Sequence, residues 1–102
     1  MTEQFITGYI PQRMQQLGFS RYYLNYHDMM VKGNSSNELY AYNQLWFVVD
    51  DPVGLLIESD YGIYDSTGTY ISNSVHEHRG EIIITNPDAG DKKIKMIQVI
   101  II

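Results

Sequence analysis

The sequence contains no cysteine, which excludes disulfide bonds, thiol catalysis and zinc sites built on thiolates. Basic residues are also few, since seven Lys and Arg stand against twelve Asp and Glu, for a formal net charge of −5. Because binding to nucleic acid requires a basic face that meets the phosphates, this balance predicts no nucleic-acid partner. No apolar run approaches the length of about 18 residues that a membrane span needs, so no span is expected.

What is present is the composition of one globular domain. Hydrophobic residues make up 44% of the 102 residues and charged residues 19%, and this length leaves no room for a second domain of ordinary size. Nine Tyr, three Phe and one Trp make the chain rich in aromatic residues. Because aromatic side chains favour strands, a β-rich fold is expected.

The first 19 residues differ from the rest. Pro11 suits the first turn of a helix, and Gly18 suits its end. We predict a short helix over Pro11–Leu17, within an N-terminal arm of residues 1–19. A helix of about two turns is marginal alone, so the arm is expected to dock on a neighbouring subunit.

Alternation with a period of two dominates from residue 20 onward, and turn formers separate the alternating segments. The predicted strands are Arg21–Val31, Glu38–Asp50, Leu55–Glu58, Gly62–Tyr64, Tyr70–Ser72, Glu81–Thr85 and Lys92–Ile102. The last two are expected to form a closing hairpin. Residues 20–102 are therefore predicted to form an all-β domain, an antiparallel β-sandwich (jelly-roll or Ig-like) of about seven strands.

Large residues occupy both faces of the predicted strand Glu38–Asp50. Strict alternation places Leu39, Ala41, Asn43, Leu45, Phe47 and Val49 on one face, and Tyr40, Tyr42, Gln44, Trp46 and Val48 on the other. Tyr22, Tyr23 and Tyr26 belong to the preceding strand, which is expected to be its neighbour. The resulting Tyr-rich surface has three interpretations: aromatic pairing within the sheet, a protein interface, or a sugar or peptide site.

The last strand is apolar on both faces, because the sequence runs Val99-Ile100-Ile101-Ile102. An exposed edge of this composition would aggregate. The strand is therefore expected to be central in the sheet, to be covered, or to pair with another chain, and the sequence leaves the first and third options open.

One spacing suits a metal. On a strand His76 and His78 point to the same side, and Glu81 is close enough in sequence to join them. His-x-His followed by Glu is similar to the first motif of the cupin family, a resemblance that implies a metal-dependent enzyme. The spacing departs from the family, because only two residues separate His78 from Glu81 and no later His supplies the second motif. The alternative interpretation is a polar loop or strand entry with solvated or hydrogen-bonded histidines.

No catalytic set is recognisable in the sequence. A nucleophile elbow and a phosphate-binding glycine loop are both absent. We therefore predict a protein that is not an enzyme and that uses no cofactor or metal.

As a whole the chain resembles small virion proteins of tailed phages, namely decoration, collar or head–tail ring subunits. The resemblance rests on the short helical segment Ile10–Gly18, the single β-sandwich, and the closing hairpin that ends on a hydrophobic strand. The Asn- and Tyr-rich, cysteine-free composition is similar to that of crAss-like phages. No family motif is matched residue by residue, so no functional residues are carried over. The resemblance implies a structural protein that is present in many copies in the virion and is assembled in the host cytoplasm.

The predicted partners are other protein subunits, either copies of this chain or a larger scaffold. The contacts are expected from the arm, the Tyr-rich face and the last strand. The residues are Phe5, Ile6, Tyr9, Met14, Leu17, Tyr22, Tyr40, Tyr42, Trp46, Ile100, Ile101 and Ile102. The alternative function is a small carbohydrate- or peptide-binding module that uses Tyr22, Tyr40, Tyr42 and Trp46.

Overall fold

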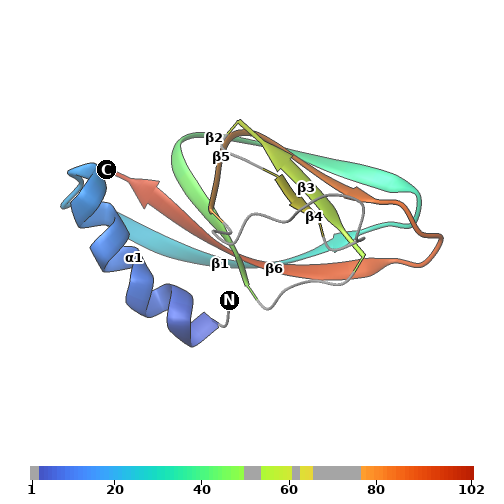
Figure 1. The fold of residues 1–102 in the computed structure, drawn as a ribbon, viewed down its shortest axis with the longest axis horizontal. Coiled ribbons are helices and arrows are strands. Elements are labelled where there is room, and N and C mark those ends of the chain that lie inside the picture. The colour runs from blue at the N-terminus through green and yellow to red at the C-terminus, as the bar shows by residue number, and fades with distance from the viewer. Residues whose placement is uncertain (1–2, 50–53, 61–62, 66–76) are drawn as a thin grey trace.

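The computed structural model describes residues 3–49, 54–60, 63–65 and 77–102. One helix precedes six strands that form a single antiparallel sheet (Figure 1). The elements are α1 (Glu3–Leu17), β1 (Tyr22–Val31), β2 (Ser35–Val49), β3 (Leu56–Ser59), β4 (Ile63–Asp65), β5 (Glu77–Asn86) and β6 (Lys92–Ile101). Their order across the sheet is β1-β6-β2-β5-β3-β4. The predicted strand Tyr70–Ser72 lies outside the described residues.

Strand β2 folds the sheet onto itself. Its first half pairs with β5 and its second half pairs with β6, and Trp46 and Phe47 also pair with His78 and Glu77 of β5. The register with β5 shifts between Ala41 and Trp46, where Asn43 has a positive φ of 59°. Asparagine is one of the few residues with a side chain that adopt this conformation readily. Because β2 bends here, β5 and the first half of β2 run above β1 and β6 in Figure 1, as two layers of one sheet.

The predicted β-rich fold with a short N-terminal helix is confirmed, whereas two separate sheets and about seven strands are not. The described residues form one sheet of six strands, because β2 hydrogen-bonds to both layers. The predicted closing hairpin is wrong as well. Strand β5 pairs with β2 and β3, and β6 pairs with β1 and β2, so the connection between β5 and β6 crosses from one layer to the other.

The two crossing turns meet at one end of the molecule. The turn from β1 to β2 touches the turn from β5 to β6, since the Asn34 N–H donates to the Asp88 carbonyl oxygen at 2.8 Å. Asn86 is fully buried beneath them. Its Nδ2 donates to the carbonyl oxygens of Val31 (3.1 Å) and Gly90 (2.7 Å), and its Oδ1 accepts from the Asp88 N–H (3.1 Å). This amide therefore fastens both layers to the second turn.

The bend also changes which positions of β2 face the interior, from odd-numbered to even-numbered residues. Ala41 faces the interior before the bend, and Trp46 and Val48 face it afterwards. The expected strict alternation is therefore wrong across Asn43, because the extra residues of the bulge shift the period. Past the bend both faces of β2 are buried, which explains why both carry large side chains.

Two hydrophobic cores lie on the two faces of the β6–β2 layer. The inner core, between the layers, contains Val31, Ala41, Trp46, Val48, Leu55, Ile57, Ile82, Ile84, Ile94 and Met96. The outer core, under the helix, contains Ile6, Ile10, Met14, Leu45, Phe47, Val49, Ile97 and Val99. Residues of β6 alternate between the two cores, so this strand is buried on both sides.

Helix α1 is longer than the sequence predicted. It begins at Glu3 rather than Pro11, because Ile6, Ile10 and Met14 follow one another at a spacing of four and are fully buried on one face. Pro11 lies inside the helix on its exposed side, where it removes one main-chain hydrogen bond. Gly18 ends the helix as predicted, with φ of 83° and the Phe19 N–H donating to the Met14 carbonyl oxygen at 2.9 Å.

Candidate protein interface

The residues predicted to contact other subunits occupy different environments. Ile6 and Met14 are fully buried in the outer core, so the prediction that they contact a neighbour does not hold: the N-terminal segment packs on its own sheet. Phe5 is 59% exposed and stacks on Tyr9 with ring centroids 6.4 Å apart. Tyr9 in turn meets the Phe47 ring edge-on at 6.1 Å. Leu17 is half-buried against the outer core.

The expected Tyr-rich face is divided by the fold. Tyr22 packs half-buried against the outer core, whereas Trp46 is 6% exposed and belongs to the inner core. Tyr40 and Tyr42 are exposed on the outside of the β2–β5 layer, at 61% and 67%. Strands β1 and β2 are not paired, contrary to expectation, because β6 lies between them in the sheet. The four residues of the carbohydrate or peptide alternative therefore do not form one surface.

The last strand is central. Strand β6 pairs with β1 on one side and with β2 on the other. Pairing of this strand with another chain is thus excluded, and the first option left open by the sequence holds. Ile100 and Ile101 are half-buried, and Ile102 is 70% exposed beyond the end of the strand.

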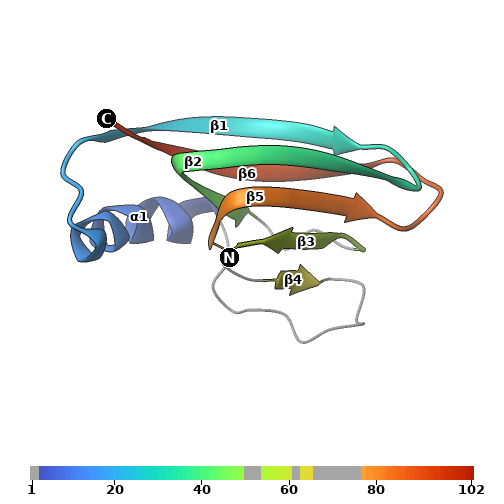
Figure 2. The same ribbon diagram turned by 90° about the horizontal axis from the view of Figure 1, so that it is seen from above.

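Strand β1 is the long edge of the sheet. No strand of the described chain pairs with its outer side, and it forms the upper edge of the molecule in Figure 2, with α1 well below it. Tyr23, Tyr26 and Met30 on this strand are each about half exposed (49%, 56% and 49%). Sequence reasoning singled out the tyrosines but assigned the possible edge to the last strand.

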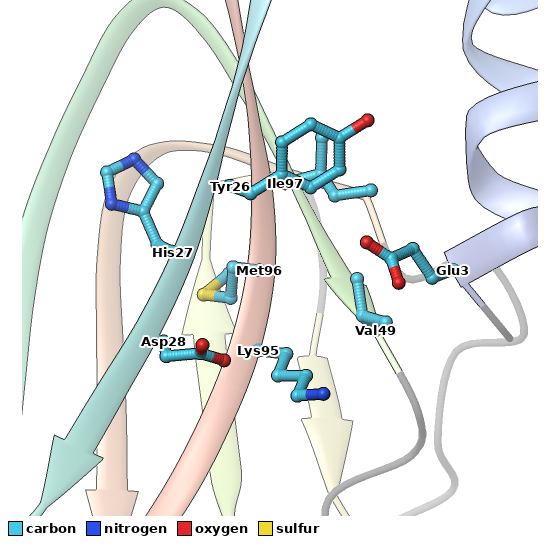
Figure 3. A pocket seen from close by; sticks show the side chains of 8 residues that line it. All are labelled: Glu3, Tyr26, His27, Asp28, Val49, Lys95, Met96 and Ile97. Carbon is cyan, nitrogen blue, oxygen red and sulfur yellow. The ribbon is translucent and has the colours of Figure 1, made fainter.

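A small hollow borders this edge near the start of the helix. It has a volume of about 90 Å³, and Figure 3 shows the eight side chains around it. Asp28 and Lys95 are register partners on β1 and β6, and Glu3 projects toward the hollow from the helix. Three other hollows, over the edges of β2, β3 and β5, have volumes of about 210, 240 and 250 Å³, below the roughly 300–1,000 Å³ of ligand sites.

Polar side chains connect three strands inside the fold. His27 Nε2 donates to Gln98 Oε1 at 2.8 Å, and Gln98 Nε2 donates to Gln44 Oε1 at 2.7 Å. The Trp46 ring lies 4.8 Å from the His27 ring, with its buried Nε1 unpaired among the described residues. This series of hydrogen bonds links β1, β6 and β2 and gives His27 a structural role.

The predicted metal ligands do not form a site in the described part of the chain. His76 lies outside the described residues. His78 is 1% exposed, and its Nδ1 is 2.8 Å from Ser59 Oγ. Glu81 is exposed, and its main-chain N–H donates to Asp60 Oδ2. No group of three His, Asp or Glu residues in the described ranges could hold a metal ion.

The charged pair that sequence reasoning missed is Arg13 with Glu77. Glu77 is fully buried at the start of β5, and Arg13 reaches it from α1 with two hydrogen bonds, Nε to Oε1 at 2.8 Å and Nη2 to Oε2 at 3.0 Å. Such a two-pronged contact fixes orientation. Charge pattern alone gives no signal for a contact 64 positions apart in the chain.

An exposed tyrosine is electrostatically perturbed. Glu38 lies beside Tyr40 on β2, and the Tyr40 hydroxyl donates to Glu38 Oε2 at 3.3 Å. The negative charge of Glu38 and this hydrogen bond raise the pKa of Tyr40 above its ordinary value of 10.0, and Glu81 adds to the effect.

Comparison with known proteins gives no relative. No family model matches the chain, and neither a curated protein nor a solved structure matches it. In the described part of the chain the helix is neither long nor apolar enough to cross a membrane.

Proposed function

We propose that this chain is a non-enzymatic structural subunit that acts through protein–protein contacts, in many copies in a phage virion, as a decoration, collar or head–tail component. The observation that supports the proposal is the exposure of large apolar side chains. Phe5, Tyr26, Tyr40 and Tyr42 are each more than half exposed, and they come from α1, β1 and β2. Aromatic residues are the side chains most enriched at protein interfaces.

The distribution of polar groups supports the same conclusion. The buried side chains of Asn86 and Glu77 and the half-buried side chain of Gln98 bond to other parts of the fold rather than converge on a hollow. The hollows described above are smaller than ordinary ligand sites. Among the described residues, the exposed aromatic side chains are therefore the feature that best supports recognition of another protein.

Light scattering on a sizing column tests the proposal, across concentrations from about 1 µM to about 1 mM. We expect a discrete oligomer whose mass is a multiple of 11.8 kDa, and closed rings or shells by electron microscopy. A monomer at every concentration overturns self-assembly.

A further inference from the structure

We propose that the free edge of β1 pairs with β1 of a second copy of this chain, antiparallel and centred on Asn25, to form a two-fold symmetric dimer. This inference rests on the proposed function, and it names the surface and the partner. It follows from the direction of the main-chain groups, the absence of the usual edge protection, and the placement of charge.

The direction of the main-chain groups can be derived from one hydrogen bond. The Ile102 N–H donates to the Arg21 carbonyl oxygen at 3.1 Å, one position beyond the Tyr22–Ile101 register pair. In an antiparallel ladder, alternate residues point both main-chain groups to the same neighbour. Odd-numbered residues of β1 therefore face β6, and even-numbered residues face the free edge.

A second contact agrees with this assignment. Asn37 Nδ2 from β2 donates to the carbonyl oxygen of Met30, an even-numbered residue, at 3.1 Å. That oxygen is therefore occupied. The even-numbered residues with both groups at the free edge are Tyr22, Leu24, Tyr26 and Asp28.

Natural edge strands are blunted by lysine, proline or a bulge. Strand β1 has no lysine and no proline, and its register with β6 is continuous from Tyr22 to Val31. Asp28 is its single Asp, Glu, Lys or Arg. An edge of ten residues without these devices is a surface for strand addition. The helix does not obstruct it (Figure 2).

Pairing centred on Asn25 engages all four free residues. Tyr22 lies opposite Asp28 of the second copy, and Leu24 lies opposite Tyr26, which gives about eight main-chain hydrogen bonds across the two-fold axis. Because a symmetric interface meets itself, Asn25 faces Asn25.

Charge selects the antiparallel over the parallel arrangement of two copies, and the antiparallel register accommodates a second copy as occupant. A parallel pairing would set Asp28 against Asp28. The antiparallel pairing centred on Asn25 separates the two carboxylates by about 20 Å, six residues along the strand, and places each near a Tyr22 hydroxyl that can donate to it. The pairing therefore brings no like charges together.

Introduction of a charged side chain at Asn25 tests the register. Asn25 is exposed, so Asn25→Lys and Asn25→Asp should fold. Each variant places two like charges face to face on the two-fold axis, and we expect the dimer dissociation constant measured by light scattering to rise about five-fold or more. An equimolar mixture of the two variants should recover dimer as the mixed species. Gln12→Lys, an exposed substitution on α1, is the matched control and should leave dimerisation unchanged.

Tyr26→Pro provides a second variant. The Tyr26 N–H points to the free edge, so proline removes two hydrogen bonds of the symmetric dimer, one from each copy, without breaking the β1–β6 ladder. We expect about a ten-fold loss of dimer, with an unchanged circular dichroism spectrum. An oligomer that survives Asn25→Lys and Tyr26→Pro overturns pairing through β1 but leaves self-assembly standing. A monomeric wild-type protein at every concentration overturns both.

Discussion

Arg13 and Glu77 form a buried ion pair that joins the helix to the folded sheet. Their side chains are 16% and 0% exposed, with two hydrogen bonds between them. Glu77 would otherwise be a carboxylate without water around it, so the pair fixes how α1 lies on β5. Apolar contacts under the helix supply attraction but tolerate sliding, whereas this contact specifies one orientation.

Removing only the arginine should strongly destabilise the fold. We expect Arg13→Met to lower the free energy of unfolding by about 3–5 kcal/mol, because the buried Glu77 loses its partner. The double variant with Glu77→Leu should be more stable than Arg13→Met alone, since no buried charge remains. Urea denaturation measures both, with the exposed Arg21→Met as control. A double variant less stable than the single would contradict this interpretation.

The left-handed conformation of Asn43 predicts a strict preference at the bend of β2. Asn43→Val should lower the free energy of unfolding by about 1–2 kcal/mol, because a β-branched side chain is strained at positive φ. Asn43→Gly should remain within about 0.5 kcal/mol of the wild type. Thermal or urea unfolding checks this, and Tyr42→Val, one residue earlier and exposed, controls for β-branching alone. Equal losses in the free energy of unfolding for Tyr42→Val and Asn43→Val would refute the left-handed conformation assigned to Asn43.

Asn86 should contribute more to the free energy of unfolding than an exposed asparagine does. Asn86→Ala removes three hydrogen bonds and leaves buried main-chain groups unsatisfied, so we expect a loss of about 2–3 kcal/mol in the free energy of unfolding. Asn37→Ala removes the hydrogen bond from its side chain to the Met30 carbonyl oxygen and should cost about 1 kcal/mol or less. Denaturant unfolding of both variants makes the comparison. Similar losses would show that Asn86 does not hold the turns together.

The raised pKa of Tyr40 has a direct test. Glu38→Gln removes both the negative charge and the charged acceptor, so the pKa of Tyr40 should fall toward 10.0. Because the pKa is higher in the folded chain, this contribution to stability is fully present below pH 10.0 and is lost as the pH rises through the folded value. An NMR titration of the Tyr40 ring in the wild type and in Glu38→Gln measures the change. No change in Glu38→Gln would rule out Glu38 as the main cause.

The sequence was sufficient for most individual strands. The predicted strands Arg21–Val31 and Lys92–Ile102 match the observed β1 and β6 within one residue, because strong alternation and turn formers mark their limits. The end of the helix at Gly18 was equally predictable. The helix start was missed because Pro11 suggested a first turn. The spacing of Ile6, Ile10 and Met14 instead indicates one helical face that extends on both sides of Pro11.

The arrangement of the strands was beyond a single sequence. Nothing local distinguishes a turn within one layer from a turn that crosses between layers, so the strands around residues 33 and 88 were taken for simple hairpins. The exchange of faces at Asn43 depends on one residue in a left-handed conformation. Consequently Trp46 was placed on a surface with Tyr40, although the fold buries one and exposes the other.

The central position of β6 bears on how this chain reaches its native state. Strand β6 is the last of the described strands in chain order, yet it pairs with the first and supplies Ile97 and Val99 to the core under the helix. Neither β1 nor α1 has its complete packing surface until residues 92–101 are available. Such distant pairing lengthens the loops that must close, and topologies of this kind fold on the scale of milliseconds to seconds. Until that moment β1 has both edges open, so an emerging chain is most prone to mispairing just before synthesis of this segment is finished.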